Sequence, residues 1–80
     1  MKRKVYVIFQ NTSIHHINSL VCAVRLWDEV EDVTKALHPN GKQELLRVYH
    51  VTLKDRVDPS LVVNRLETFV EIYSATLLPR

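Results

Sequence analysis

Five consecutive β-branched or aromatic residues, Val5-Tyr6-Val7-Ile8-Phe9, constrain the fold of this chain more than any other feature. Such residues favour extended backbone, and the turn-forming residues Asn11, Thr12 and Ser13 follow them directly. Because none of the five is charged, we predict a strand that is covered on both faces and lies centrally in a sheet or beneath helices.

Residues 43–54 predict a second strand, because their side chains alternate in character. The odd positions present one apolar face that a single charge interrupts: Leu45, Arg47, Tyr49, Val51 and Leu53. The even positions begin apolar and become polar toward Lys54, which is typical of a strand with one buried face.

Asp58 and Pro59 predict the start of a C-terminal helix, with Asp58 as the N-cap and proline at the first helical position. We expect this helix to continue to Pro79. Its core stripe is expected to consist of Val62, Leu66, Phe69, Val70 and Tyr73.

Residues 13–27 are open to two interpretations. As a helix capped by Ser13, the segment places one apolar stripe from Ile14 to Trp27, and this periodicity is the favoured reading. Alternatively, residues 20–27 form a buried strand. A further short helix is predicted to begin at Asp28, where Asp28 and Glu31 have the spacing of a capping box, and to end at the helix breakers of residues 38–41.

These elements predict one small two-layer α+β domain spanning residues 1–80. Its sheet is thin, with two or three strands, and two or three helices lie on one side. Two strands make a poor sheet, so we expect a homodimer that completes it. A second apolar stripe on the C-terminal helix predicts the dimer or partner interface, formed by Leu61, Thr68, Ile72 and Ala75.

Composition favours a folded chain in a reducing compartment. Hydrophobic residues make up 46% of the sequence, with one glycine, and the single cysteine, Cys22, excludes an internal disulfide. No stretch approaches the roughly 20 apolar residues of a membrane span. We therefore expect a cytoplasmic protein without membrane contact.

The sequence offers no catalytic constellation. Gly41 is the only glycine, which excludes glycine-rich phosphate loops, and the histidines and Cys22 lack the paired spacing of a zinc site. We expect no metal, no cofactor and no enzymatic activity.

Basic residues provide a different signal, although the net charge of +2 is low for a nucleic-acid-binding protein. Tyr6, Tyr49 and His50 are expected to add stacking surface to these residues. The candidate contacts are Lys2, Arg3, Lys4, Lys42, Arg47, Tyr49 and Lys54. The leading prediction is a non-enzymatic accessory, adaptor or inhibitor protein that binds a partner protein, and the alternative is a nucleic-acid-binding module.

Overall fold

The computed structural model describes residues 3–37 and 44–78, and it contains four strands and two helices in these ranges. The strands are β1 (Lys4–Phe9), β2 (Val30–Leu37), β3 (Glu44–Leu53) and β4 (Ile72–Leu77). The helices are α1 (Ile14–Arg25) and α2 (Pro59–Glu67). The predicted α+β class is confirmed, but the sheet has four strands where two or three were expected.

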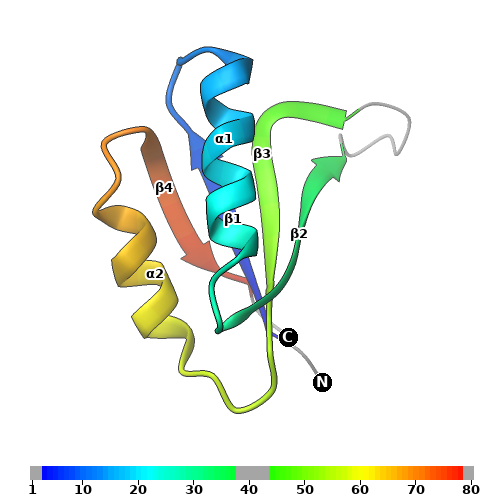
Figure 1. The fold of residues 1–80 in the computed structure, drawn as a ribbon, viewed down its shortest axis with the longest axis vertical. Coiled ribbons are helices and arrows are strands. Elements are labelled where there is room, and N and C mark those ends of the chain that lie inside the picture. Colours follow the sequence, from blue (N-terminus) through cyan, green and yellow to red (C-terminus); the bar gives the residue numbers. More distant parts are fainter. Residues whose placement is uncertain (1–2, 38–43, 79–80) are drawn as a thin grey trace.

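The four strands form one antiparallel sheet in the order β2-β3-β1-β4. Each helix connects two strands that run in the same direction and are separated by a third strand. This β-α-β-β-α-β order is the ferredoxin-like arrangement. Both helices lie on one side of the sheet (Figure 1), with α1 over β2 and β3 and α2 over β4.

The two helices begin where the sequence predicts. The Ser13 hydroxyl accepts a hydrogen bond of 3.1 Å from the His16 N–H, which confirms the helical interpretation of this segment and its N-cap. The Asp58 carboxylate accepts a bond of 3.1 Å from the Ser60 N–H, ahead of α2. Neither helix of the described ranges is long and apolar enough to cross a membrane.

The core lies between the helices and one face of the sheet. Strand β1 is central and buries Val5, Val7 and Phe9 toward the helices, whereas Tyr6 and Ile8 on its other face are half-buried. The prediction that both faces of this strand are covered is therefore wrong. The helices contribute five buried side chains to the same core: Ile17, Val21, Val24, Val62 and Leu66.

The predicted short helix beginning at Asp28 is wrong, because the segment forms strand β2. Asp28 lies exposed in the turn before this strand and caps no helix. Val30 and Val33 are both buried, three residues apart, because a bulge at Glu31 interrupts the alternation of side chains. This spacing of three imitates the period of a helix.

The predicted continuation of the C-terminal helix to Pro79 is also wrong. Helix α2 ends at Glu67, and residues 72–77 form strand β4 beside β1. Ile72 and Ala75 are buried three residues apart because a bulge at Tyr73 shifts the register. Pro79 lies outside the described residues. Two of the predicted stripe residues, Val70 and Tyr73, are 83% and 71% exposed.

The two misassigned strands follow turns of the same design. After α1, the Trp27 N–H donates to the Val24 carbonyl and the Val30 N–H to the Trp27 carbonyl. After α2, the Phe69 N–H donates to the Leu66 carbonyl and the Ile72 N–H to the Phe69 carbonyl, so Phe69 and Ile72 are equivalent to Trp27 and Val30. The ring centroids of Trp27 and Phe69 are 6.0 Å apart, so the equivalent turns of the two halves pack together.

Candidate functional site

The face of the sheet opposite the helices is uncovered within the described ranges, and we call it the open face. Lys4, Tyr6 and Ile8 of β1 alternate with the buried residues and therefore point to this face. The strand register extends this face across the sheet. It adds Val48, His50 and Thr52 from β3, Asp32 and Thr34 from β2, and Ser74 and Thr76 from β4.

Tyr6 and His50 form an aromatic pair at the middle of the open face. They are directly opposite in the register of β1 and β3, with ring centroids 5.4 Å apart and planes inclined at 55°. Thr76 and Thr34 extend this row to β4 and β2. Partial burial lowers the pKa of His50 below its ordinary value, and the charge of Lys4 lowers it further. Both effects favour the neutral form of the imidazole.

The predicted basic contacts are only partly brought together. Lys4 lies opposite Thr52 on the open face, and Lys54 follows the end of β3 nearby. Arg3 precedes β1 at the same end of the sheet, where its carbonyl accepts from the Leu53 N–H. Arg47 lies toward the opposite end of β3, where its Nη2 donates to Asn11 Oδ1 at 3.0 Å. Lys2 and Lys42 lie outside the described residues.

Tyr49 is a correction to the predicted nucleic-acid contacts. Its side chain is 4% exposed and faces the helices, where it packs edge-on against Phe9 at 5.6 Å. The ring belongs to the core and offers no stacking surface. His50, the next residue along the strand, takes the opposite face because side chains alternate.

The predicted interface residues do not form one stripe. Leu61 is 62% exposed on α2, and the Thr68 hydroxyl donates to the Arg65 carbonyl at the helix end. Ile72 and Ala75 are each 7% exposed in β4 and belong to the core. The prediction of one helical stripe is therefore wrong, because α2 ends at Glu67 and residues 72–77 form β4.

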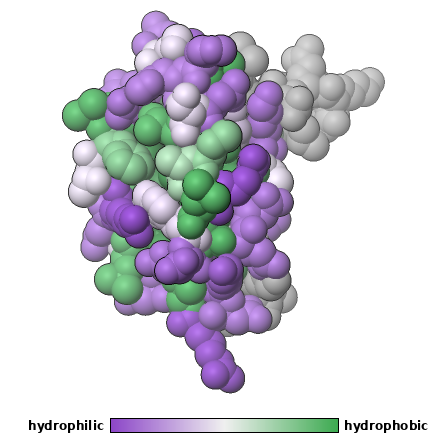
Figure 2. All heavy atoms as spheres, in the orientation of Figure 1, coloured by the Kyte–Doolittle hydropathy of each residue, from purple (hydrophilic) through white to green (hydrophobic). Residues whose placement is uncertain are grey.

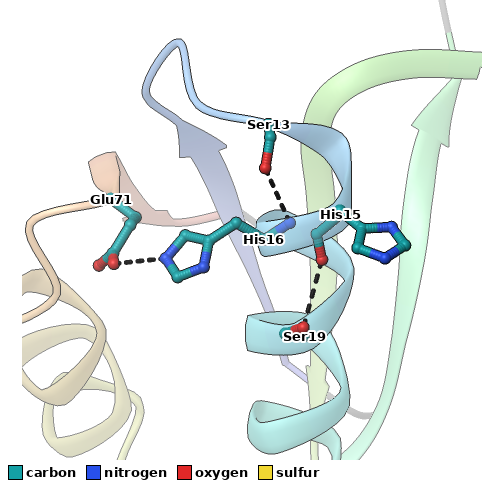
Figure 3. Close-up of polar contacts among 5 residues, drawn as sticks. All are labelled: Ser13, His15, His16, Ser19 and Glu71. Carbon is teal, nitrogen blue, oxygen red and sulfur yellow. Dashed lines mark hydrogen bonds and ion pairs between the residues drawn. The ribbon is translucent and has the colours of Figure 1, made fainter.

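A histidine–carboxylate pair joins the first turn of α1 to the α2–β4 turn. His16 Nε2 donates to Glu71 Oε2 at 2.7 Å, and this bond holds the pKa of Glu71 below its ordinary value. Figure 3 shows His15 pointing away from His16, to the other side of the helix. The neighbouring Ser13 and Ser19 hydroxyls bond to the backbone of α1. The pair therefore links the start of α1 to the segment that precedes β4.

A groove of about 510 Å³ lies between α1 and the edge strand β2. Its walls include Cys22, Arg25 and Lys35, with Val21 and Val33 among the apolar residues. The Arg25 guanidinium is engaged within the protein, because it bonds to the Val33 carbonyl at 2.6 Å. No group of three potential metal ligands occurs in the part of the chain that the structure describes.

The sequence interpretation named Tyr6, His50 and Lys4 but missed the surface that connects them. Ile8 and Val48 look like core residues because both are aliphatic, yet they face away from the helices. Ser74 and Thr76 were assigned to a helix. The signal that identifies the open face is the strand register, which depends on pairing between residues far apart in the chain.

Comparisons of the chain with protein-family models, with curated proteins and with solved structures found no match.

Proposed function

We propose that this protein is a non-enzymatic binding module and that its open face binds single-stranded nucleic acid. The observation that carries the proposal is the Tyr6–His50 pair, which presents two rings on the central strands of the sheet, on the side that neither α1 nor α2 covers. The alternative function predicted from the sequence thereby becomes the leading one.

Two adjacent aromatic rings offer a surface for unpaired bases. Bases of single-stranded nucleic acid stack on aromatic side chains with little dependence on sequence, and known RNA-binding modules use the open face of a four-stranded sheet in this way. Ile8 and Val48 lie beside the rings and extend the apolar floor. The hydroxyls of Thr34 and Thr76 flank the pair and supply hydrogen-bonding groups for base edges or sugars.

The charge at one end of this surface suits a phosphate backbone. Lys4 and Tyr6 are two residues apart on β1 and therefore point to the same face. Arg3 and Lys54 lie at the same end of the sheet as Lys4. Asp32 lies on the same face opposite Thr52 and reduces the positive charge there, although Arg25 partly offsets it at a distance of 3.7 Å. Few cations contribute, so we expect weak binding that falls with added salt.

Fluorescence anisotropy with a labelled single-stranded oligonucleotide of about eight nucleotides tests the proposal, since small single-strand-binding domains such as OB-folds cover roughly 4–16 nucleotides. Tyr6→Ala removes one stacking platform worth about 1–3 kcal/mol, so the dissociation constant rises about 5- to 150-fold. Tyr6→Phe keeps the ring and retains binding. Circular dichroism establishes that each variant is folded.

The matched histidine controls separate the open face from the helix side. His50→Ala weakens binding, whereas His15→Ala, which removes an exposed histidine from α1, leaves binding unchanged. Wild-type protein that shows no salt-sensitive binding, or Tyr6→Ala protein that binds as wild type does, contradicts the proposal.

A partner protein is the second candidate, in the accessory, adaptor or inhibitor role predicted from the sequence. It is supported by exposed apolar side chains outside the open face: Leu26 is 84%, Val70 is 83% and Leu61 is 62% exposed. Figure 2 views the helix side and shows its hydrophobic groups interrupted by hydrophilic ones, which favours this candidate less. An affinity pull-down with this protein as bait tests this candidate. A captured protein that no longer binds Leu61→Ser but still binds Tyr6→Ala supports it.

We also propose a reducing, cytoplasmic setting for either function. The support is the lone cysteine, Cys22, which is free and exposed on α1. An exposed thiol persists in a reducing compartment and is oxidised readily outside one.

A further inference from the structure

The two edges of the sheet differ in how they are protected. On β2, a bulge, the charges of Glu31, Asp32 and Lys35, and direct capping all oppose the addition of another strand. The Asp32 carboxylate accepts from the Val33 N–H at 2.8 Å, and the Arg25 guanidinium donates to the Val33 carbonyl at 2.6 Å. The outward main-chain groups of Val33 are therefore occupied.

Strand β4 has none of this protection along residues 74–77. Its six residues, Ile72–Leu77, include no charged side chain. The bond from the Leu78 N–H to the Lys4 carbonyl fixes which β4 residues bond to β1, because bonded pairs alternate in an antiparallel ladder. By this alternation Ser74 and Thr76 turn their main-chain groups toward β1. Ala75 and Leu77 therefore turn theirs to the free edge, where no described side chain caps them.

We propose that two copies of this chain pair through β4 and form one continuous sheet of eight strands, twice the four of one copy. A two-fold axis near Thr76 makes the pairing antiparallel and places the free groups of Ala75 on one copy opposite those of Leu77 on the other. Thr76 of one copy then lies opposite Thr76 of the other, and no like charges meet. The occupant of this edge is a second copy because the segment is uncharged and self-complementary.

This arrangement keeps both pairs of helices on one side of the combined sheet. A two-fold axis between antiparallel neighbours runs perpendicular to the sheet, so the open faces of the two copies become continuous. The sequence predicted a dimer through exposed side chains of a helix that included Ile72 and Ala75. The dimer proposed here uses the backbone of β4 instead, because the side chains of these two residues are buried in the core.

Sedimentation equilibrium tests the pairing without any nucleic acid, over roughly a hundredfold range of micromolar protein concentration, because dimer formation depends on concentration. Thr76 and Thr34 are exposed threonines on the same face of opposite edge strands, which makes them matched sites. Thr76→Lys brings like charges together at the free edge and raises the dimer dissociation constant by about tenfold or more. Thr34→Lys leaves it unchanged.

Ser74→Lys is the second variant on the β4 edge and should dissociate the dimer as Thr76→Lys does. Circular dichroism confirms that the lysine variants fold. Three results overturn the proposal: a wild type that stays monomeric throughout the range, equal weakening by Thr34→Lys and Thr76→Lys, or a dimer that only Leu61→Ser dissociates. None of these results bears on binding of nucleic acid by the open face, which Tyr6→Ala tests separately.

Discussion

The Arg25 guanidinium donates a 2.6 Å hydrogen bond to the carbonyl oxygen of Val33 and so reaches from α1 around the edge of the sheet to its last strand. Asp32 completes the arrangement, because its carboxylate accepts from the N–H of the same Val33 and lies 3.7 Å from Arg25. One charged pair thus occupies both main-chain groups that Val33 would offer to a further strand. Both side chains are about half exposed, so we assign them a role in blocking the edge, with little effect on stability.

Removing this pair should open the β2 edge. In the proposed dimer β4 is already paired, so an Arg25→Ala/Asp32→Ala double variant has a second free edge at β2. This edge can pair with β2 of a further dimer, so we expect species larger than a dimer. Light scattering coupled to size-exclusion chromatography measures this. Arg65→Ala is the control, since Arg65 is 53% exposed against 50% for Arg25 but lies over Trp27, away from the edge. Unchanged assembly in the double variant would show that other features block β2.

The titration of His50 should report its surroundings on the open face. Burial is the larger cause of its lowered pKa and Lys4 the smaller, so Lys4→Gln should raise the pKa toward 6.5 without reaching it. Nuclear magnetic resonance of the imidazole protons measures the shift. A pKa that does not respond to Lys4→Gln would place the lysine charge too far from His50 to act on it.

The same shift has an expected consequence for stability. Because the folded-state pKa of His50 is lowered, the unfolded chain takes up a proton first as the pH falls below about 6.5. Folding stability should therefore decrease from pH 6.5 down through the folded-state pKa, and His50→Gln should remove this part of the pH dependence. Nucleic-acid binding should strengthen over the same range, since protonated His50 adds a positive charge beside Lys4.

Much of the fold was predictable from local signals. The apolar run of β1, the alternation of β3 and the two N-caps, Ser13 and Asp58, all act within a few residues of the chain, and the structure confirms them. Strands β2 and β4 were not predictable in this way. Each follows a turn without glycine or proline, and each contains a bulge that spaces its buried residues by three.

The open face was likewise only partly predictable from local signals. Tyr6, His50 and Lys4 were identified from their residue types, but Tyr49 was wrongly joined to them because its neighbours in the sheet were unknown. Which face a strand residue takes depends on the position of the helices. That position is fixed by packing between distant segments, which a periodicity within ten residues does not reveal.

Ile72 and Leu61 distinguish the observed fold from a single long C-terminal helix. Ile72 is 7% exposed in β4, so Ile72→Glu buries an unpaired carboxylate at a cost of several kcal/mol. A domain of this size has only roughly 4–12 kcal/mol of stability, so we expect the variant to be largely unfolded. Ile72→Val should cost about 0.5–1.5 kcal/mol.

Leu61 is the matched control for Ile72. It is 62% exposed on α2, and Leu61→Glu should change stability by no more than about 0.5 kcal/mol. Chemical denaturation followed by circular dichroism measures all three variants. A folded Ile72→Glu protein, or an unfolded Leu61→Glu protein, would contradict the assignment of residues 72–77 to a core strand.

Two aspartates test which segments begin helices. The Asp58 carboxylate accepts from the backbone N–H of Ser60 and, at 2.7 Å, from its hydroxyl, and these bonds hold the pKa of Asp58 below its ordinary value. Asp58→Ala should therefore lower the Tm by roughly 4–8 °C, as expected for loss of an N-cap in a domain of this size. Asp28 has the sequence context of a capping box but lies in the turn before β2, so Asp28→Ala should leave the Tm nearly unchanged. Asp58→Asn, which still accepts the hydrogen bond to Ser60, should recover most of the loss. Thermal denaturation of the three variants at pH 7 decides the matter, because a larger loss from Asp28→Ala than from Asp58→Ala would restore the helix that the sequence pattern predicts at residue 28.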